Sequence, residues 1–127
     1  MVKSILIVDD CSLNQQLVGE LFKRSMCVNK WSITLTCASC LADAKIYLQK
    51  YQFDIITLDG QMGFERGYDL IPFIKESQIQ SPKIIMISNH DRSIAIGLEY
   101  GASQSIVKDD ITKNVRINTE FLLIPMT

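Results

Sequence analysis

The sequence predicts an α/β fold in which five short strands alternate with helices as one (βα)5 unit. Short, continuous apolar runs suited to buried parallel strands recur at residues 3–9, 54–59 and 83–87. Between them, apolar residues return at the spacing of helices that cover a sheet. No repeat, linker or low-complexity stretch interrupts the alternation, so we expect residues 1–127 to form a single domain.

The first strand, residues 3–9, leads into a helix that we expect to extend to about Ser25. Ser12 and Gln15 fit a capping box at the start of this helix. Apolar residues at helical spacing mark its inward face: Leu13, Leu17, Leu21 and Phe22.

The second strand is expected at residues 31–37, where polar and apolar side chains alternate as in a more exposed strand. We expect Ser39 to cap the helix that follows. Three apolar residues are expected to face inward from this helix: Ala42, Ile46 and Leu48.

The third strand, residues 54–59, is followed by a glycine-rich loop from Gly60 to Gly67. A helix over about residues 68–77 comes next. Pro72 is compatible with its first turn, because the amides there lack intrahelical partners.

The fourth strand, residues 83–87, precedes a helix that we expect Asp91 to cap and Gly101 to terminate. Residues 105–108 form a short fifth strand. Both a helix and an extended segment fit the apolar pattern of residues 110–124, and we favour a helix, which makes the last element atypical.

The charges of the chain are balanced. The 13 basic and 14 acidic residues are scattered, so we expect no direct binding to nucleic acid and no attraction to an anionic membrane. No apolar segment approaches the length of a membrane span. Only four apolar residues follow Lys3 before two aspartates, so we expect no secretory signal and a reduced, cytoplasmic location.

Cys37 and Cys40 have the C-x-x-C spacing of a redox or metal motif. The sequence has no second pair of this kind, and its single histidine, His90, is distant in the chain. We therefore expect ordinary thiols at a strand end and a helix start.

Three aspartates directly follow the apolar cores of two strands: Asp9 and Asp10 end the first, and Asp59 ends the third. One such residue is most simply a turn or helix cap. In parallel strands, however, the carboxyl ends meet at one edge of the sheet, where open α/β sheets bind ligands. Unit charges about 4 Å apart repel by roughly 4 kcal/mol at an effective dielectric near 20, so three ionised carboxylates need a cation or protons. Oxygen ligands favour Mg²⁺ or a similar hard ion.

Two further polar residues are expected at the same edge. Ser88 ends the fourth strand and Lys108 ends the fifth. Read alone, the serine is a cap or turn hydroxyl and the lysine a solvated strand end. Their joint placement beside the three carboxylates predicts a common site.

These residues occur in four segments that together resemble the receiver domain of two-component response regulators, over residues 1 to about 110. Each segment alone is a weak signal, but their order and separations are specific. They are the acidic pair after residues 5–8, the segment 54–62 with Gly67 eight residues after Asp59, the strand 84–88, and residues 101–108. The resemblance implies a doubly wound, flavodoxin-like parallel sheet with strand order 2-1-3-4-5.

The resemblance also implies that Asp59 is a phosphoacceptor. The protein is then not an enzyme in the usual sense and has only self-phosphorylation and autodephosphorylation chemistry. The phosphoryl group would come from a phosphohistidine on a sensor histidine kinase or a phosphotransfer domain. Lys108 would contact the acyl-phosphate oxygens and Ser88 would donate a hydrogen bond to them. The output would be a changed surface for a downstream protein target, with a homodimer as a further possibility.

In the same reading, Mg²⁺ is the cofactor. Asp10, Asp59 and the backbone carbonyl of Gln61 would hold it, and Asp9 would contribute directly or through solvent.

Three residues depart from the usual receiver pattern. Ser105 stands where an aromatic switch residue is common, which puts the aromatic relay in doubt. Asp109 replaces a proline that usually follows the lysine through a cis bond, and we expect a trans bond here because a non-proline cis bond costs about 2.5–4 kcal/mol. Gly63 replaces a proline in the acceptor loop and is expected to loosen it.

Three alternatives stay open. A flavin-binding protein requires a phosphate loop after the first strand, for which residues 10–14 are a poor substitute. A haloacid-dehalogenase-like phosphatase requires a second carboxylate where this chain has Gln61. The strongest alternative is a receiver fold that serves as a constitutive protein-interaction module, favoured by Ser105, Gly63 and Asp109. Residues 1–127 contain no effector domain, so we expect either a stand-alone docking protein or a piece of a longer regulator or hybrid kinase.

Overall fold

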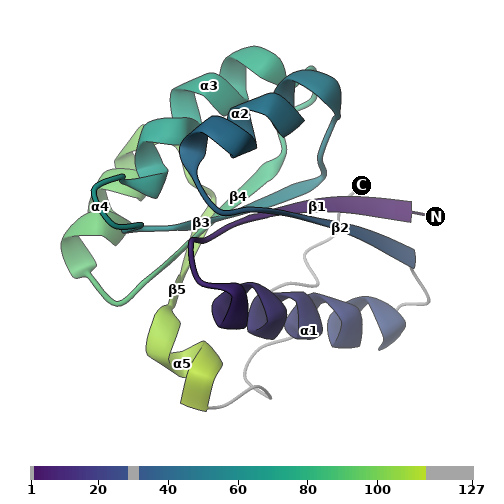
Figure 1. Ribbon diagram of the computed structural model, residues 1–127, viewed down its shortest axis with the longest axis horizontal. Helices are drawn as coiled ribbons and strands as arrows, with labels where there is room; N and C mark the ends of the chain where they lie inside the picture. The colour runs from purple at the N-terminus through teal and green to yellow at the C-terminus, as the bar shows by residue number, and fades with distance from the viewer. Residues whose placement is uncertain (1, 29–31, 114–127) are drawn as a thin grey trace.

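In the computed structural model, five parallel strands form one sheet with helices on both faces (Figure 1). The structure describes residues 2–28 and 32–113. The strand order is β2-β1-β3-β4-β5, which confirms the predicted doubly wound α/β fold. The strands are β1 (Val2–Val8), β2 (Ser32–Ala38), β3 (Ile55–Asp59), β4 (Lys83–Ser88) and β5 (Gln104–Val107).

Helices α1 and α5 lie on one face of the sheet, and α2, α3 and α4 lie on the other (Figure 1). A short 3-10 helix, η1, leads directly into α3. The helices are α1 (Ser12–Val28), α2 (Leu41–Lys50), η1 (Gly67–Leu70), α3 (Ile71–Ser77), α4 (Asp91–Tyr100) and α5 (Lys108–Lys113). None of the described helices is long and apolar enough to cross a membrane.

The central strands are buried on both sides, because alternate side chains of a strand point to opposite faces of the sheet. In β1, Leu6 and Val8 join the core beneath α2 and α3, whereas Ile5 and Ile7 join the core beneath α1. This double burial explains the continuous apolar runs seen in the sequence.

Helix α1 differs from the prediction at both ends. It extends to Val28, and its first leucine, Leu13, is exposed, whereas Leu21 and Phe22 are buried as predicted. The Gln15 side chain does not reach back to Ser12. Its Nε2 atom donates to the carbonyl of Asp9 at 2.6 Å and so holds the turn that follows β1.

Helix α2 starts one residue later than predicted and presents a different face. Cys40, not Ser39, is the N-cap, and its sulfur accepts a hydrogen bond from the amide of Asp43. Leu48 is buried as predicted, but its inward partner is Ala44, and Ala42 and Ile46 are exposed. Residues two apart on a helix point about 200° apart, so Ile46 cannot share a face with Leu48.

Cys40 and Cys37 are free thiols at a helix start and in a strand, in agreement with the prediction.

The boundaries of the later helices and strands agree closely with those predicted from the sequence. Pro72 lies in the first turn of α3, and Gly101 ends α4 in the left-handed conformation with φ 118°. Helix α4 begins at Asp91 with His90 as its N-cap, one residue before the predicted cap. Lys108 is the first residue of α5 and not the last of β5. The predicted helix over 110–124 is therefore observed to Lys113, and its remainder lies outside the described residues.

Candidate functional site

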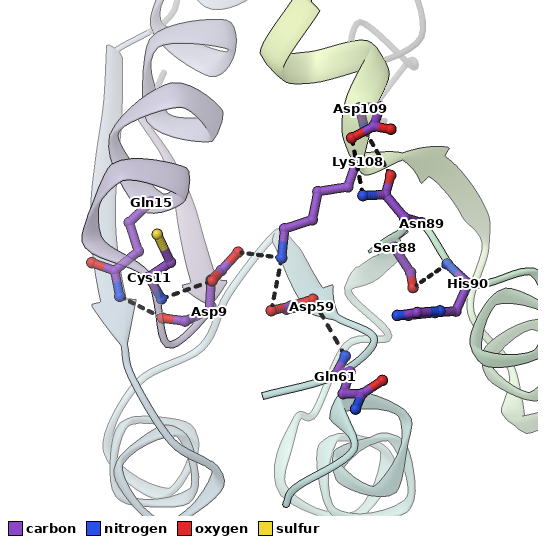
Figure 2. A network of polar contacts seen from close by, with 10 residues as sticks. All are labelled: Asp9, Cys11, Gln15, Asp59, Gln61, Ser88, Asn89, His90, Lys108 and Asp109. Carbon is purple, nitrogen blue, oxygen red and sulfur yellow. Dashed lines mark hydrogen bonds and ion pairs between the residues drawn. The ribbon is translucent and has the colours of Figure 1, made fainter. Parts of the chain in front are cut away.

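The polar residues predicted at the strand ends are brought together by the register of the sheet. Val8 pairs with Leu58, so Asp9 and Asp59 emerge side by side. Lys108 follows β5 and points back across the edge, and its amine lies between the two aspartates (Figure 2). Ser88 ends the neighbouring strand β4.

Lys108 forms two ion pairs with buried carboxylates. Its Nζ atom is 3.0 Å from Oδ2 of Asp59 and 3.8 Å from Oδ2 of Asp9. Among the described residues, Oδ2 of Asp59 accepts no well-directed hydrogen bond, so charge rather than hydrogen-bond geometry holds this contact. Burial lowers the pKa of Lys108, but the contact with Asp59 and the charges of Asp9 and Asp10 outweigh it and raise the pKa above its usual value.

Asp9 is buried, and its Oδ1 atom accepts a hydrogen bond from the amide of Cys11 at 2.9 Å. Burial raises its pKa to about 6, and the charges of Asp59 and Asp10 add to this effect. The Cys11 amide and Lys108 act in the opposite direction and compensate only in part. The acidic cluster is therefore electrostatically strained when fully ionised.

The three carboxylates fit a hard divalent cation. One ligand oxygen from each of Asp9, Asp10 and Asp59 lies within 4.8 Å of the others. Asp10 is exposed while the other two are buried, so a bound ion would keep one side open to water. Mg²⁺ prefers such a site, because it binds to a few carboxylates and retains several waters. Lys108 supplies one positive charge against the three carboxylates, so the ionised cluster keeps a net negative charge that a cation can neutralise.

Gln61 also contacts the central aspartate, through its backbone amide. The amide nitrogen donates to Oδ1 of Asp59 at 3.3 Å. The role of the Gln61 carbonyl as a metal ligand stays a prediction.

Ser88 is buried, and its Oγ atom accepts a hydrogen bond from the amide of His90 at 3.0 Å. The hydroxyl stands close against the chain that leaves β3: a Cβ atom at Gly60 would lie only 2.6 Å from Oγ. Gly60 therefore provides the space in which Ser88 approaches the end of β3.

The sequence matches the profile of the response regulator receiver domain over residues 5–117. The chain belongs to this family.

Solved receiver structures share the fold. The response regulator domain of Thermotoga maritima CheB is 20% identical with a TM-score of 0.76, and the alignment covers 99% of this chain and 94% of that one. CheY4, a chemotaxis response regulator of Vibrio cholerae, is 23% identical with a TM-score of 0.73, over 97% and 94% of the two chains. A Burkholderia pseudomallei response regulator, determined with a phosphorylated aspartic acid, a calcium ion and citrate, is 19% identical with a TM-score of 0.64, over 94% and 70%. No curated protein matches the chain.

This receiver domain has a pair of hydrogen bonds that the sequence analysis missed. Nδ2 of Asn89 donates to Oδ1 of Asp109 at 3.0 Å, and the amide of Asp109 donates to Oδ1 of Asn89 at 2.8 Å (Figure 2). We call this pair the Asn89–Asp109 clasp. It ties the loop after β4 to the start of α5. Each partner directly follows a residue predicted at the sheet edge, Ser88 or Lys108, but no signal in the sequence pairs their side chains.

The clasp depends on the residue that replaces the usual proline. The described residues contain no cis peptide bond, so Asp109 follows Lys108 through a trans bond as predicted. Proline has no amide hydrogen and could not make the bond to Asn89.

The loop after β3 forms a tight turn at Gly63, and the expected loosening of this loop by glycine stays a prediction. The amides and carbonyls of Met62 and Glu65 form two reciprocal hydrogen bonds of 2.9 and 3.0 Å around a tight turn. Gly63 adopts φ 61° there, which proline cannot reach. Oε1 of Glu65 also accepts the amide of Leu41, so the turn is fastened to the start of α2.

Close packing against β3 requires a glycine at position 67. A Cβ atom at this position would overlap the carbonyl of Asp59, so only glycine lets η1 pass so close to the end of β3. Ser105 lies half-buried in β5, and its register partner is Met86 of β4.

Proposed function

We propose that this receiver domain is the phosphoacceptor of a two-component system and that Asp59 accepts a phosphoryl group in an Mg²⁺-dependent reaction. The observation that carries the proposal is the position of Asp59. It is a buried carboxylate at a strand end, 3.0 Å from the amine of Lys108 and clustered with Asp9 and Asp10. Family membership supports the same assignment.

The donor is a phosphohistidine of a sensor histidine kinase or a phosphotransfer domain. A carboxylate oxygen of Asp59 attacks phosphorus, and a new O–P bond forms while the P–N bond of the donor breaks. The electron pair of the broken bond remains on the departing imidazole. Phosphoryl transfer is catalysed mainly by positioning and by charge, both of which a fixed carboxylate and a fixed amine supply.

Mg²⁺ would be held by the carboxylates of Asp9, Asp10 and Asp59 and by the Gln61 carbonyl. When bound, it neutralises charge on the phosphoryl oxygens and on the carboxylates. Lys108 is already paired with Asp59, so its amine needs only a short shift to meet a phosphoryl oxygen attached there.

Ser88 acts as a hydrogen-bond donor after transfer. Its oxygen already accepts the amide of His90, which leaves its own O–H free to point at a phosphoryl oxygen. The backbone of the loop after β4 is thereby linked to the state of Asp59, and a surface for a downstream protein target changes with it.

The domain acts as an acceptor and not as a turnover enzyme. Self-phosphorylation and autodephosphorylation are its only chemistry. It works in the cytoplasm without direct contact to nucleic acid or membranes, and homodimer formation is one form that its output can take.

A second candidate is a constitutive interaction module with atypical or no phosphorylation switching. The Asn89–Asp109 clasp favours it, because two hydrogen bonds hold together the loops that would respond to phosphorylation.

The test is incubation of the protein with acetyl phosphate and Mg²⁺, followed by intact-mass measurement. We expect one added phosphoryl group in the wild type and none in Asp59→Asn. Asp69→Asn, on the exposed surface of η1, is the matched control and should be phosphorylated normally. Phosphate that persists on Asp59→Asn excludes the assignment, and a wild type that never reacts favours the second candidate.

A further inference from the structure

A cavity of about 350 Å³ lies between the chain that follows β3 and the first turns of α4. We call it the Arg66–Arg92 cavity. Its polar lining comes from both sides of this gap and includes Gln61, Arg66, Tyr68, His90 and Arg92. A volume of this size suits a small organic molecule rather than a helix or a strand of a partner.

The lining is rich in donors and carries positive charge. It contains two guanidinium groups and one imidazole, and no carboxylate belongs to it. Guanidinium groups bind carboxylates and phosphates through paired, charge-assisted hydrogen bonds. The cavity is therefore suited to an anion.

Both arginines are available for a ligand. Within residues 2–28 and 32–113, neither Arg66 nor Arg92 forms an ion pair with a carboxylate. Arg66 makes a long contact of 3.4 Å from Nη1 to the carbonyl of Glu65. Arg66 is half-buried and Arg92 is exposed, so both side chains are accessible to an anion that enters the cavity.

Other features of the wall also favour an anion. His90 is the N-cap of the ten-residue helix α4 and makes no side-chain capping bond, so it leaves amides at the helix start without a side-chain acceptor from the cap. Tyr68 is held in place by an edge-to-face contact with Tyr100, with ring centroids 5.6 Å apart. The cavity thus has a fixed wall beside its charged groups.

The cavity adjoins the acceptor site and shares two residues with it. Gln61 lines the cavity while its amide contacts Asp59, and His90 lines it while its amide contacts Ser88. Figure 2 shows the His90 ring extending below Ser88 toward the side on which Asp59 and Gln61 lie.

We propose that the Arg66–Arg92 cavity binds a small organic anion with two or more negative charges on carboxylate or phosphate groups. A bound anion places negative charge beside the path of a phosphoryl donor, and so it slows phosphorylation of Asp59. The effect on phosphorylation rests on the proposed function, whereas the binding of an anion to the cavity does not.

Binding is tested with the ¹⁵N-labelled full chain, titrated at constant ionic strength with succinate and, in a second arm, with inorganic phosphate. Acetate, with one charge, is the control ligand. We expect amide shifts to cluster at Gln61, Arg66 and residues 90–93. Loss of one guanidinium partner should raise the Kd about tenfold in Arg66→Gln and in Arg92→Gln.

Lys50→Gln is the matched control, because it removes one exposed positive charge at the far end of α2. It should leave the Kd unchanged. Shifts that cluster around Lys108, equal binding of acetate, or an unchanged Kd in both arginine variants would overturn the proposal. A response to phosphate alone or to succinate alone identifies which anionic group the cavity takes.

The rate is tested by intact-mass time courses with acetyl phosphate and Mg²⁺, with and without saturating succinate. We expect slower phosphorylation with succinate in the wild type, and in Arg66→Gln the same slowing should require about tenfold more succinate. Binding in the cavity without any effect on the rate would refute the regulatory statement. A wild type that is never phosphorylated would refute the proposed function instead, and the titration would still decide whether the cavity binds anions.

Discussion

At the ends of β1 and β3, buried carboxylates are held by the charge of one lysine, whereas at the ends of β4 and β5 exposed side chains hydrogen-bond one another. Asp9 and Asp59 are almost inaccessible to solvent. Asn89 and Asp109 form their clasp on the surface. The first region carries the aspartates of the usual receiver pattern, and the second contains two of its three departures, Ser105 and Asp109.

The difference shows that the two regions tolerate substitution unequally. A buried charge that loses its partner is strongly destabilising. Removal of Lys108 while Asp9 and Asp59 stay ionised is therefore poorly tolerated in the first region. A surface hydrogen bond contributes only about 1 kcal/mol, so the second region can exchange a proline for a clasp without loss of the fold. The buried carboxylate cluster and the surface clasp can therefore change independently of each other.

The largest expected effect comes from neutralising Asp9 in metal-free buffer. Its pKa is about 6 in the folded protein and 3.8 in the unfolded chain, so the folded state holds the proton more tightly. Stability from this group is present below pH 4 and is lost as the pH rises from about 4 to about 6. Asp9→Asn removes the cost and should stabilise the protein at pH 7 by at most about 3 kcal/mol, with little effect at pH 4.

The measurement is urea unfolding of both proteins across this pH range. Glu76→Gln, an exposed carboxylate on α3, is the control and should follow the wild type. Equal stability of Asp9→Asn and the wild type at pH 7 would contradict the electrostatic strain described for the first region.

An intermediate effect is expected from the clasp. Asn89→Asp removes the side-chain donor and sets two carboxylates against each other, so it should cost about 1 kcal/mol. Asp109→Asn keeps the acceptor oxygen and should change the stability little. In the double variant, the two side chains exchange roles, and the lost stability should return. A double-mutant cycle by urea unfolding measures this coupling, and additive effects would show that the clasp contributes nothing.

The smallest expected effect is the change of amide exchange on phosphorylation. With no aromatic side chain at Ser105 to relocate, the response should centre on residues 88–93 and reach Asp109 through the clasp, while residues 104–107 change little. Asn89→Ala should remove the change at Asp109 and keep the rest. Large changes of amide exchange in residues 104–107 with none in residues 88–93 would contradict this expectation.

The strand ends could be predicted from the sequence, because apolar runs and the residues that follow them are local signals. The hydrogen-bond partners of individual side chains could not be predicted in the same way. The predicted inward face of α2 was wrong at Ala42 and Ile46, because apolar residues lie all around this short helix and Ile46 points about 200° away from Leu48. The clasp depends on two residues twenty positions apart that only the packing of β4 against β5 brings together. The positive φ of Gly63 could not be predicted, because a glycine in a sequence permits this conformation without requiring it.

His90 is the only histidine of the chain. Its amide contacts Ser88 and its side chain lines the Arg66–Arg92 cavity, so it borders both sites. After exchange of the amides in D2O, its Hε1 proton gives the single histidine signal of this type in a one-dimensional proton NMR spectrum, without isotope labelling. This signal would respond to a change at either site, so it offers a spectroscopic reporter for both proposals on the unmodified chain.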